Sequence, residues 1–362
     1  MASKLRPLYD RLYIRGEAIY NGISESRGCR ARAAAVTPDP RVDTDYVRVI
    51  RPYWKQFRVR TPKKYWFRLY CSGGNPFSPQ YIPENLWFRD IVPHYNNLIF
   101  AKALQDKCMF GRLFPQLPQP ETVLRRMAGV YTDGNGTLLT EAEAAARCRG
   151  VGRVILKPSV STGRGHGIRF FDTDSITEEE LFSHFRSCGQ NFIVQKKLTQ
   201  HPELALFNPR SVNTVRVMTF LHGDSVRVLS AILRIGGGDN EVDNVSQGGY
   251  QCTIRPDGRL EPTAITKQSG QWVRVSQTAG GVSFDRQAVP SFDRILDAVR
   301  SAAGSIGHFR LLGWDIAVRP DGEPVLIEYN VIPGQNQSTC GPTFGDLTDE
   351  VLEEVYGRRQ RR

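Results

Sequence analysis

Three residues near the C-terminus carry oxygen atoms at a spacing that suits a divalent cation. Asp315 lies in the apolar run 313–318, and Glu328 and Asn330 lie in the apolar run 325–330. Alternate residues of a strand point to the same face, so Glu328 and Asn330 share a face if the second run is a strand. Mg²⁺ prefers oxygen ligands and commonly completes its shell with nucleotide phosphates. We therefore expect these three residues to hold Mg²⁺, with Mn²⁺ as an alternative.

The turn between the two runs sets which residues face each other. Asp321-Gly322 is typical of a two-residue hairpin turn. Such a turn pairs Pro320 with Glu323 and, further along the hairpin, Asp315 with Glu328. Two carboxylates at cross-strand distance repel each other unless a cation lies between them. The alternative is a pair of solvated acids on an exposed hairpin face.

A lysine followed by a glycine-rich loop suits a phosphate group. Lys157 ends the expected strand 153–158, and a second expected strand covers 168–171. Small residues let backbone N–H groups crowd around phosphate oxygens. Because no helix follows the loop, a flap over a triphosphate fits better than a Walker or dinucleotide loop; a surface hairpin without a ligand is the alternative. The expected phosphate-binding residues are Lys157, Ser159, Ser161, Thr162, Gly163, Arg164, Gly165, His166 and Gly167.

A purine base could bind at the segment 192–198, which is predicted to be a strand that runs into a connector. Backbone groups of Lys196 and the Gln195 amide can meet the hydrogen-bonding edge of a purine, with Leu198 packed nearby. An ordinary buried strand that ends in solvated lysines fits the same residues.

These segments, in this order, resemble the ATP-grasp superfamily, and within it the sugar-transfer-associated group related to alpha-L-glutamate ligases. The resemblance covers about residues 81–350. The motifs that carry it are Tyr81-Ile-Pro, Asp106-Lys107, Ser211-Val-Asn-Thr-Val-Arg216, Ile232-Leu-Arg-Ile-Gly236 and Val242-Asp-Asn-Val-Ser-Gln-Gly-Gly249.

The resemblance implies an α+β fold in which two subdomains clasp ATP between antiparallel sheets. It implies that Lys107 and Lys157 contact the nucleotide phosphates and that Arg216 faces the transferring phosphoryl group. We expect Lys157, Arg216 and Arg234 to be catalytic. The activity implied is a carboxylate–amine or carboxylate–thiol ligase that forms an acyl phosphate on a carboxylated sugar or an amino acid. The alternatives are a phosphotransferase acting on a hydroxyl group and a non-catalytic binding module.

Polar residues on and after the expected strand 225–235 are candidates for binding the acceptor. They lie in the half of the chain that should line the cleft, but the glycines 236–238 argue equally for a mobile loop that only carries them. These candidates are Arg234, Asp243, Asn244 and Gln247, and Asn213 in the expected strand 212–221 is a further acceptor candidate.

The elements that must position these residues are mostly strands. Period-two apolar patterns predict strands over 153–158, 168–171, 192–195, 212–221, 225–235, 251–254, 313–318 and 325–329. Helices are expected over 95–114, 178–187 and 293–303, a hairpin over 131–139, and a short helix capped by Thr140. The prolines within 76–93 indicate a stretch too broken for long elements.

Charge is concentrated at the N-terminus. Of the net charge of +11, +10 lies in residues 1–68, which hold sixteen Lys or Arg and six Asp or Glu. Such an excess favours an anionic substrate, a carrier or a membrane surface. The aromatic and cationic residues of 53–70 could stack on nucleic acid, but an amphipathic packing segment is favoured. The scattered, odd-numbered cysteines indicate a cytoplasmic protein. We expect a basic accessory region (1–80), an ATP-grasp domain (81–350, with subdomains 81–150, 151–200 and 201–350) and a basic tail (351–362).

Overall fold

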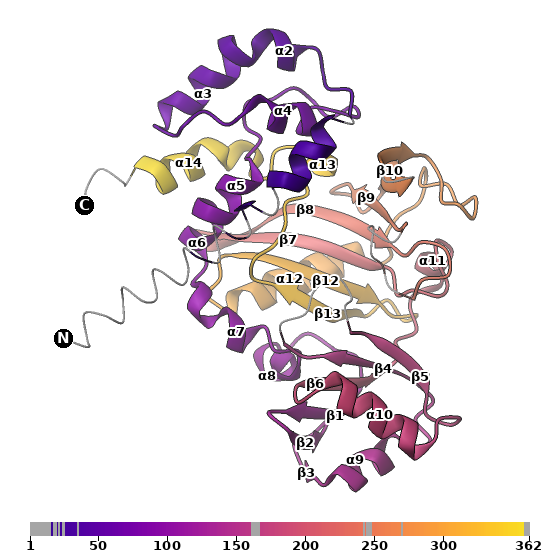
Figure 1. Ribbon diagram of the computed structural model, residues 1–362. Helices are drawn as coiled ribbons and strands as arrows, with labels where there is room; N and C mark the ends of the chain where they lie inside the picture. The colour runs from indigo at the N-terminus through magenta and orange to yellow at the C-terminus, as the bar shows by residue number, and fades with distance from the viewer. Residues whose placement is uncertain are drawn as a thin grey trace, which may run out of the picture.

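The computed structural model describes residues 16, 20, 22–23, 26–34, 36–160, 167–241, 243, 248–268 and 271–357. Within these residues the strands form an antiparallel sheet of seven strands and one of six. In Figure 1 the larger sheet crosses the middle of the molecule, the smaller sheet lies below it, and the N-terminal helices lie above it. The predicted combination of helices with antiparallel sheets is confirmed.

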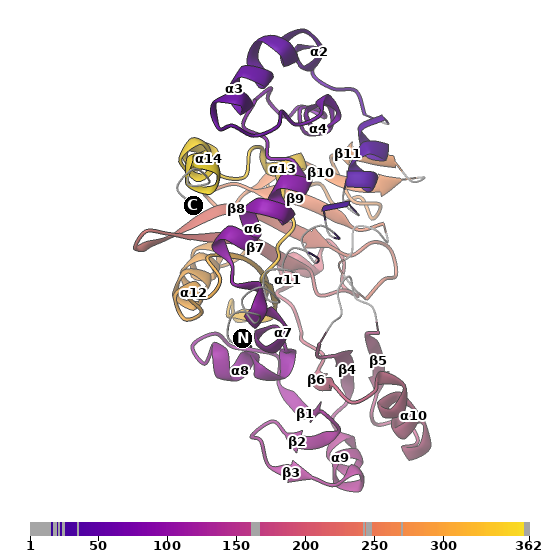
Figure 2. The ribbon, with the colours of Figure 1, turned by 60° about the vertical axis from the view of Figure 1, so that its left-hand side comes forward.

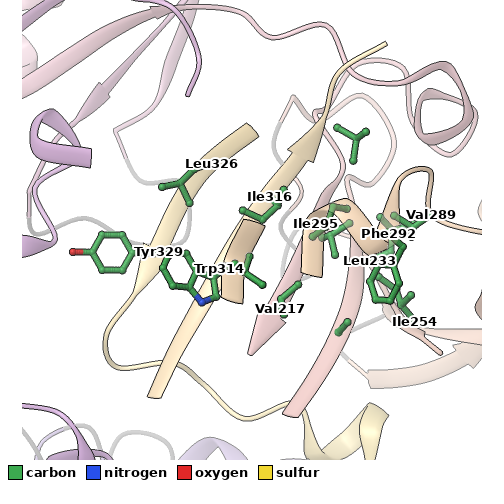
Figure 3. Packing of buried hydrophobic residues seen from close by; sticks show 14 of the residues in the cluster. Val217, Leu233, Ile254, Val289, Phe292, Ile295, Trp314, Ile316, Leu326 and Tyr329 are labelled. Carbon is green, nitrogen blue, oxygen red and sulfur yellow. The ribbon is translucent and has the colours of Figure 1, made fainter. Parts of the chain in front are cut away.

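The seven-stranded sheet carries opposite chemistry on its two faces because successive residues of a strand point to opposite sides. Val215 and Val217 belong to the apolar core that packs against helix α12 (Phe292–Gly304), whereas Arg216 lines a cavity on the other face. Figure 3 shows the apolar side, where Trp314 and Ile316 lie near Ile295 of α12. The strand order is β11 (Gln271–Val275), β10 (Leu260–Gln268), β9 (Tyr250–Ile254), β8 (Ser225–Ile235), β7 (Thr214–His222), β12 (Leu311–Val318) and β13 (Pro324–Asn330).

The N-terminal helices cover part of the face opposite α12. Met218 and Phe220 of β7 share a core with Trp54, Trp66 and Trp87. Figure 2 shows these helices on the side of the sheet away from α12, next to the C-terminal helix α14. The helices on this side are α2 (Arg41–Asp45), α3 (Arg51–Gln56), α4 (Lys64–Tyr70), α5 (Glu84–Leu86), α6 (Val92–Tyr95) and α14 (Thr348–Gly357), with a helical segment at 26–34 and a short helix α13 (Gln337–Cys340).

The six-stranded sheet forms a smaller lobe with its own core. Thr140 and Thr177 each begin a helix with a reciprocal capping box, because Glu143 and Glu180 bond back to them. The strand order is β3 (Leu138–Leu139), β2 (Val130–Asp133), β1 (Thr122–Met127), β6 (Phe192–Lys196), β4 (Arg153–Pro158) and β5 (Arg169–Asp172). Helices α9 (Glu141–Cys148) and α10 (Glu178–Cys188) contribute Ala144, Leu181 and Phe185 to its core.

Two predictions about the segment 76–114 are wrong. Residues 84–95 form one continuous helical stretch despite Pro93. A π-helical turn at Trp87–Ile91 precedes the proline, and this local change in the hydrogen-bonding pattern accommodates a residue that has no backbone N–H to donate. The expected helix 95–114 is broken instead into α7 (Ala101–Leu104), α8 (Phe110–Leu113) and two shorter turns. Asn96 interrupts it, because its buried side chain donates to the carbonyls of Leu311 and Val331.

The other predicted strands and helices lie within about three residues of their expected bounds, whereas β1, β10 and β11 were not predicted. Helix α14 occupies residues 351–357 of the expected tail, with Val351, Leu352, Val355 and Tyr356 buried. A further short helix, α11, spans Pro202–Ala205. Along the described part of the chain, no helix combines the length and apolar character needed to cross a membrane.

Candidate active site

The β12–β13 hairpin places Asp315 directly opposite Glu328, as predicted, although the turn differs from the prediction. The backbone N–H of Arg319 donates to the carbonyl of Glu323, so the turn holds three residues instead of two. That longer turn alone would place Ile327 opposite Asp315. A bulge adds one residue to β13 and restores the pairing. As a result Ile327 and Glu328, although adjacent in sequence, both line the cavity.

Asp315 is held by two arginines from neighbouring strands. Arg216 of β7 lies directly across the sheet and donates through both Nε and Nη2 to the carboxylate, at 2.6 Å for Nη2 to Oδ2. Arg234 of β8 donates to the same Oδ2 at 3.2 Å. Burial alone would raise the pKa of Asp315, but the two guanidinium groups hold it below its ordinary value. Asp315 is therefore ionised, and it fixes both arginines at the cavity.

Glu328 is held by a lysine from a different part of the chain. Lys107 Nζ lies 2.9 Å from Glu328 Oε1, and the Lys107 backbone N–H donates to the carbonyl of Ser159 at 3.0 Å. Lys107 therefore joins the end of β4 to the hairpin. Lys157 lies beside it and is buried; burial and the charge of Lys107 lower the pKa of Lys157 to about 8, against the pull of Glu328.

Asp243 completes the charged cluster. Its carboxylate lies 3.5 Å from Arg234 Nη2 and accepts a hydrogen bond from the Thr214 hydroxyl. Burial raises the pKa of Asp243, even though Arg234 opposes this shift. The described cluster thus contains one more cation than acids, which suits a polyanionic ligand. Its members are Lys107, Lys157, Arg216, Arg234, Asp243, Asp315 and Glu328.

The charged cluster lies at one end of a cavity of about 420 Å³ between the two sheets. Pro120, Ile155, Leu198 and Ile327 supply apolar surface to the cavity. Gln195 also lines it; its Nε2 donates to the Pro120 carbonyl at 3.2 Å, while its buried Oε1 has no hydrogen-bond partner within the described part of the chain. The arrangement offers an apolar slot with a free hydrogen-bond acceptor next to a group of cations and carboxylates.

Comparison with known protein families identifies the chain. The model of the family described as sugar-transfer associated ATP-grasp matches residues 89–339, which is more than half of the sequence. The chain belongs to this ATP-grasp family. The predicted family and fold are therefore confirmed, and the ligases of this superfamily use ATP and Mg²⁺.

Solved structures similar to this ATP-grasp protein include several ligases. The VanG D-Ala:D-Ser ligase from Enterococcus faecalis is 15% identical, with a TM-score of 0.43; the match covers 73% of this chain and 63% of that one. The L-amino acid ligase from Bacillus licheniformis is 13% identical, with a TM-score of 0.40; the match covers 70% of this chain and 47% of that one. This ATP-grasp chain thus spans about half to two thirds of the length of the structures it matches. No curated protein matches the sequence.

Two buried polar atoms test whether the ATP-grasp cavity fits Mg-ATP. Gln195 and Asn330 line the cavity, and Gln195 Oε1 and Asn330 Nδ2 are buried without a hydrogen-bond partner among the described residues. An unpaired buried polar atom is costly, so these atoms indicate a ligand that supplies the missing partners. Gln195 Oε1 suits a donor on a purine edge, and Asn330 Nδ2 suits a phosphate oxygen. Asn330 and Glu328 present oxygens beside the cations, so the residues present fit a nucleotide with its metal.

The structure brings most of the predicted site residues of this ATP-grasp protein together. Those that line the cavity are Lys157, Gln195, Lys196, Leu198, Arg216, Arg234, Asp243, Asp315, Glu328 and Asn330. Lys107, Ser159 and Gly167 are described but do not line it. The predicted residues Ser161, Thr162, Gly163, Arg164, Gly165, His166, Asn244 and Gln247 lie outside the described residues.

The structure does not bring Asn213, a predicted acceptor-binding residue, to the cavity. Its side chain is fully buried and donates to the carbonyls of Leu204 and Asn208, while its Oδ1 accepts from the backbone N–H of Gly236 and the hydroxyl of Ser211. All its hydrogen-bonding capacity is used to hold the loop before β7. Asn213 therefore positions the strand that carries Arg216.

Sequence reasoning missed several cavity residues. Lys197 and Glu241 form an ion pair at 3.1 Å across the cavity wall. Gln251 lies directly opposite Arg234 in the sheet, and Asn336 follows β13. The strand 251–254 that begins with Gln251 was predicted, but neither its neighbour in the sheet nor its register was. The pairing of Asp315 with Arg216 of β7 was likewise not predictable from one sequence.

Proposed function

We propose that this protein is an ATP-dependent carboxylate–amine ligase that works through an acyl phosphate. One observation carries the proposal. A single cavity contains an apolar slot with an unpaired acceptor, the cationic side chains of Lys157, Arg216 and Arg234, and the side chains of Asp315, Glu328 and Asn330. Lys107 is paired with Glu328 beside it. The slot suits a purine, the cations suit phosphates, and the oxygen donors suit Mg²⁺.

The proposed residue roles follow from this geometry. Asp315, Glu328 and Asn330 would hold Mg²⁺, which when bound neutralises charge on the phosphates. Lys107 and Lys157 would contact the phosphates. Arg216 and Arg234 are already fixed by Asp315, so they can stabilise charge on the phosphoryl group in flight with little reorganisation.

In the proposed reaction, a carboxylate oxygen of the acceptor attacks the γ-phosphorus and ADP leaves. The nitrogen of the amine then attacks the carbonyl carbon, phosphate leaves, and the nitrogen loses a proton. The acceptor we propose is a carboxylated sugar or an amino acid. The seven free cysteines support a cytoplasmic setting for this reaction. We also propose that the basic accessory region ends, and the ATP-grasp domain begins, near residue 80.

A screen of carboxylic acids with ATP, Mg²⁺ and hydroxylamine tests the proposal. Hydroxylamine traps an activated acyl group as a hydroxamate without knowledge of the natural amine. We expect hydroxamate, ADP and inorganic phosphate to form together with at least one acid. Phosphorus NMR adds a second criterion, because a stable phosphoester with ADP would instead identify a phosphotransferase and contradict the proposal.

A further inference from the structure

A second cavity lies beside the nucleotide cavity. It has a volume of about 410 Å³ and is walled on one side by the N-terminal region, through residues such as Arg32 and Ser72. The opposite wall comes from β11, through Trp272 and Arg274. Gln251 and Asn336 line both cavities, so the two spaces adjoin. The nucleotide function described above does not use the second cavity.

Two arginines line the second cavity without a carboxylate of the described chain at ion-pair distance. The Arg32 guanidinium lies 6.0 Å from the ring centre of Trp272 and donates to Cys29 Sγ at 2.8 Å. Arg274 donates to Asn75 Oδ1 at 3.0 Å and to the Ser338 carbonyl at 3.3 Å. Both side chains are partly buried, and Glu84 and Glu261 act on them only from beyond ion-pair distance. Partly buried charges without a counter-ion in contact are costly, which indicates an anionic ligand.

The loop over Arg274 is built for close approach. Gly73 has a φ of +61°, and a Cβ at this position would lie 2.9 Å from Arg274 Nε. Glycine is favoured at this backbone conformation, and a side chain here would displace the Arg274 guanidinium from its present position. The N-terminal region therefore packs directly against Arg274, and Asn75 from the same loop accepts a hydrogen bond from its guanidinium.

A single row of side chains connects the two cavities along the sheet. Arg274 of β11 lies opposite Ile265 of β10, Ile265 opposite Gln251 of β9, and Gln251 opposite Arg234 of β8. Directly opposed residues point to the same face, so this row forms a continuous floor. Three strand spacings separate Arg274 from Arg234, which corresponds to about 14 Å.

We propose that the second cavity binds the far, anionic end of an elongated acceptor whose reacting carboxylate lies at Arg234. The inference rests on the proposed ligase function and specifies its substrate class: an acid with a second carboxylate or a phosphate about 14 Å from the reacting group. Arg32 and Arg274 bind that second anion. The N-terminal region is thus a wall of the acceptor site.

Calorimetric titration of the full-length protein with dodecanedioate, a long dicarboxylate, and with succinate, a short one, tests this proposal. We expect dodecanedioate to bind more tightly than succinate. Arg274→Gln and Arg32→Gln should each weaken dodecanedioate about tenfold or more, as expected for loss of a charged hydrogen-bonding partner. Arg259→Gln is the matched control, because Arg259 is exposed and lies outside both cavities. A parallel titration with ω-phosphonododecanoate distinguishes the two anions, since tighter binding than dodecanedioate indicates a phosphate-bearing acceptor.

Equal affinity for the long and short acids, no binding of either long acid, or unchanged binding in both arginine variants would overturn the proposal. ADP affinity should stay unchanged in Arg274→Gln, which shows that the variant is folded. The hydroxamate screen separates this inference from the ligase proposal. Hydroxamate formation with an unchanged KM for the acid in Arg274→Gln refutes the second site alone, whereas arginine-dependent binding without hydroxamate refutes the ligase proposal alone.

Discussion

At the scale of single residues, each acid of the proposed metal site is already paired with a protein cation. Glu328 is paired with Lys107, and Asp315 with Arg216. In each pair the protein cation occupies the side of the carboxylate that Mg²⁺ would otherwise have to neutralise alone. We infer that the pairs keep the site preorganised when the metal is absent.

Replacing Glu328 with glutamine should abolish most Mg²⁺-dependent turnover. The change keeps the size of the side chain but removes a charged oxygen ligand, so we expect kcat to fall about 100-fold or more. Turnover of ATP measured against Mg²⁺ concentration checks this. Glu323→Gln on the same hairpin is the control, because Glu323 pairs with Arg294 at the turn and should leave turnover unchanged. Full activity of Glu328→Gln at saturating Mg²⁺ would refute the metal assignment.

Lys157 should give nucleotide binding a distinctive pH dependence. Its pKa is lowered by burial to about 8, and phosphate binding favours the charged form. The dissociation constant for ADP should therefore rise above pH 8, by about tenfold per pH unit for one linked proton. Lys157→Met should bind ADP weakly and without this inflection. An inflection that persists in Lys157→Met would assign the titration to another group.

The lowered pKa of Lys157 also affects the stability of the protein without ligand, and there the effect increases with pH. Between the folded pKa of about 8 and the ordinary value of 10.5, the unfolded chain binds more protons than the folded one. The contribution of Lys157 to the free energy of unfolding must then increase with pH across that window. Urea titrations at several pH values should show this increase in the native chain and lose it in Lys157→Met.

At the scale of elements, the bulge in β13 separates two functions that lie next to each other in sequence. Ile327 faces the apolar slot and Glu328 faces the cations. Ile327→Ala should weaken ADP binding about three- to tenfold through lost apolar contact but leave the Mg²⁺ concentration for half-maximal turnover unchanged. Glu328→Gln should do the reverse. If Ile327→Ala alters the Mg²⁺ dependence, the two residues are not separated as proposed.

The strands that carry the site were predictable because their patterns are local. The apolar runs around Asp315 and Glu328 identify two strands, and a glycine-containing turn joins them. The bulge was not predictable, and the pairing of Asp315 with Glu328 was right only because the bulge offsets a turn one residue longer than expected. The partners Arg216 and Lys107 come from remote segments, so no local pattern could place them beside the acids.

Helices were harder to predict where a buried polar group decides their ends. Asn96 bonds to two backbone carbonyls of distant strands and thereby ends a helix that the apolar pattern would continue. Pro93 suggests a break in the helix, yet the π-helical turn at Trp87–Ile91 accommodates the missing backbone N–H of the proline. Both outcomes depend on tertiary contacts, which override local propensity.

At the scale of the whole molecule, the N-terminal region is joined to the rest of the chain by a shared core. Trp54 and Trp66 are buried with Phe344 and Leu352 from the C-terminal end. The cationic side chains between the aromatic residues lie at the surface, so the segment 53–70 is the amphipathic packing segment that was favoured. The basic region thus supports the sheet that carries the site as well as the wall of the second cavity.

Removing residues 1–70 should therefore destabilise the whole protein and not only impair acceptor binding. The deletion takes Trp54, Trp66 and Phe67 out of a core that also contains Met218 and Phe220 of β7. As a milder change, Trp66→Ala should lower the free energy of unfolding by about 3–5 kcal/mol, measured by urea denaturation. Trp272→Ala is the matched control, because Trp272 is only partly buried and should cost less. A truncated chain that unfolds cooperatively, with the stability of the full-length protein, would show that the N-terminal region does not contribute to the stability of the rest. The N-terminal residues that line the second cavity would then not be held against β11 by the shared core.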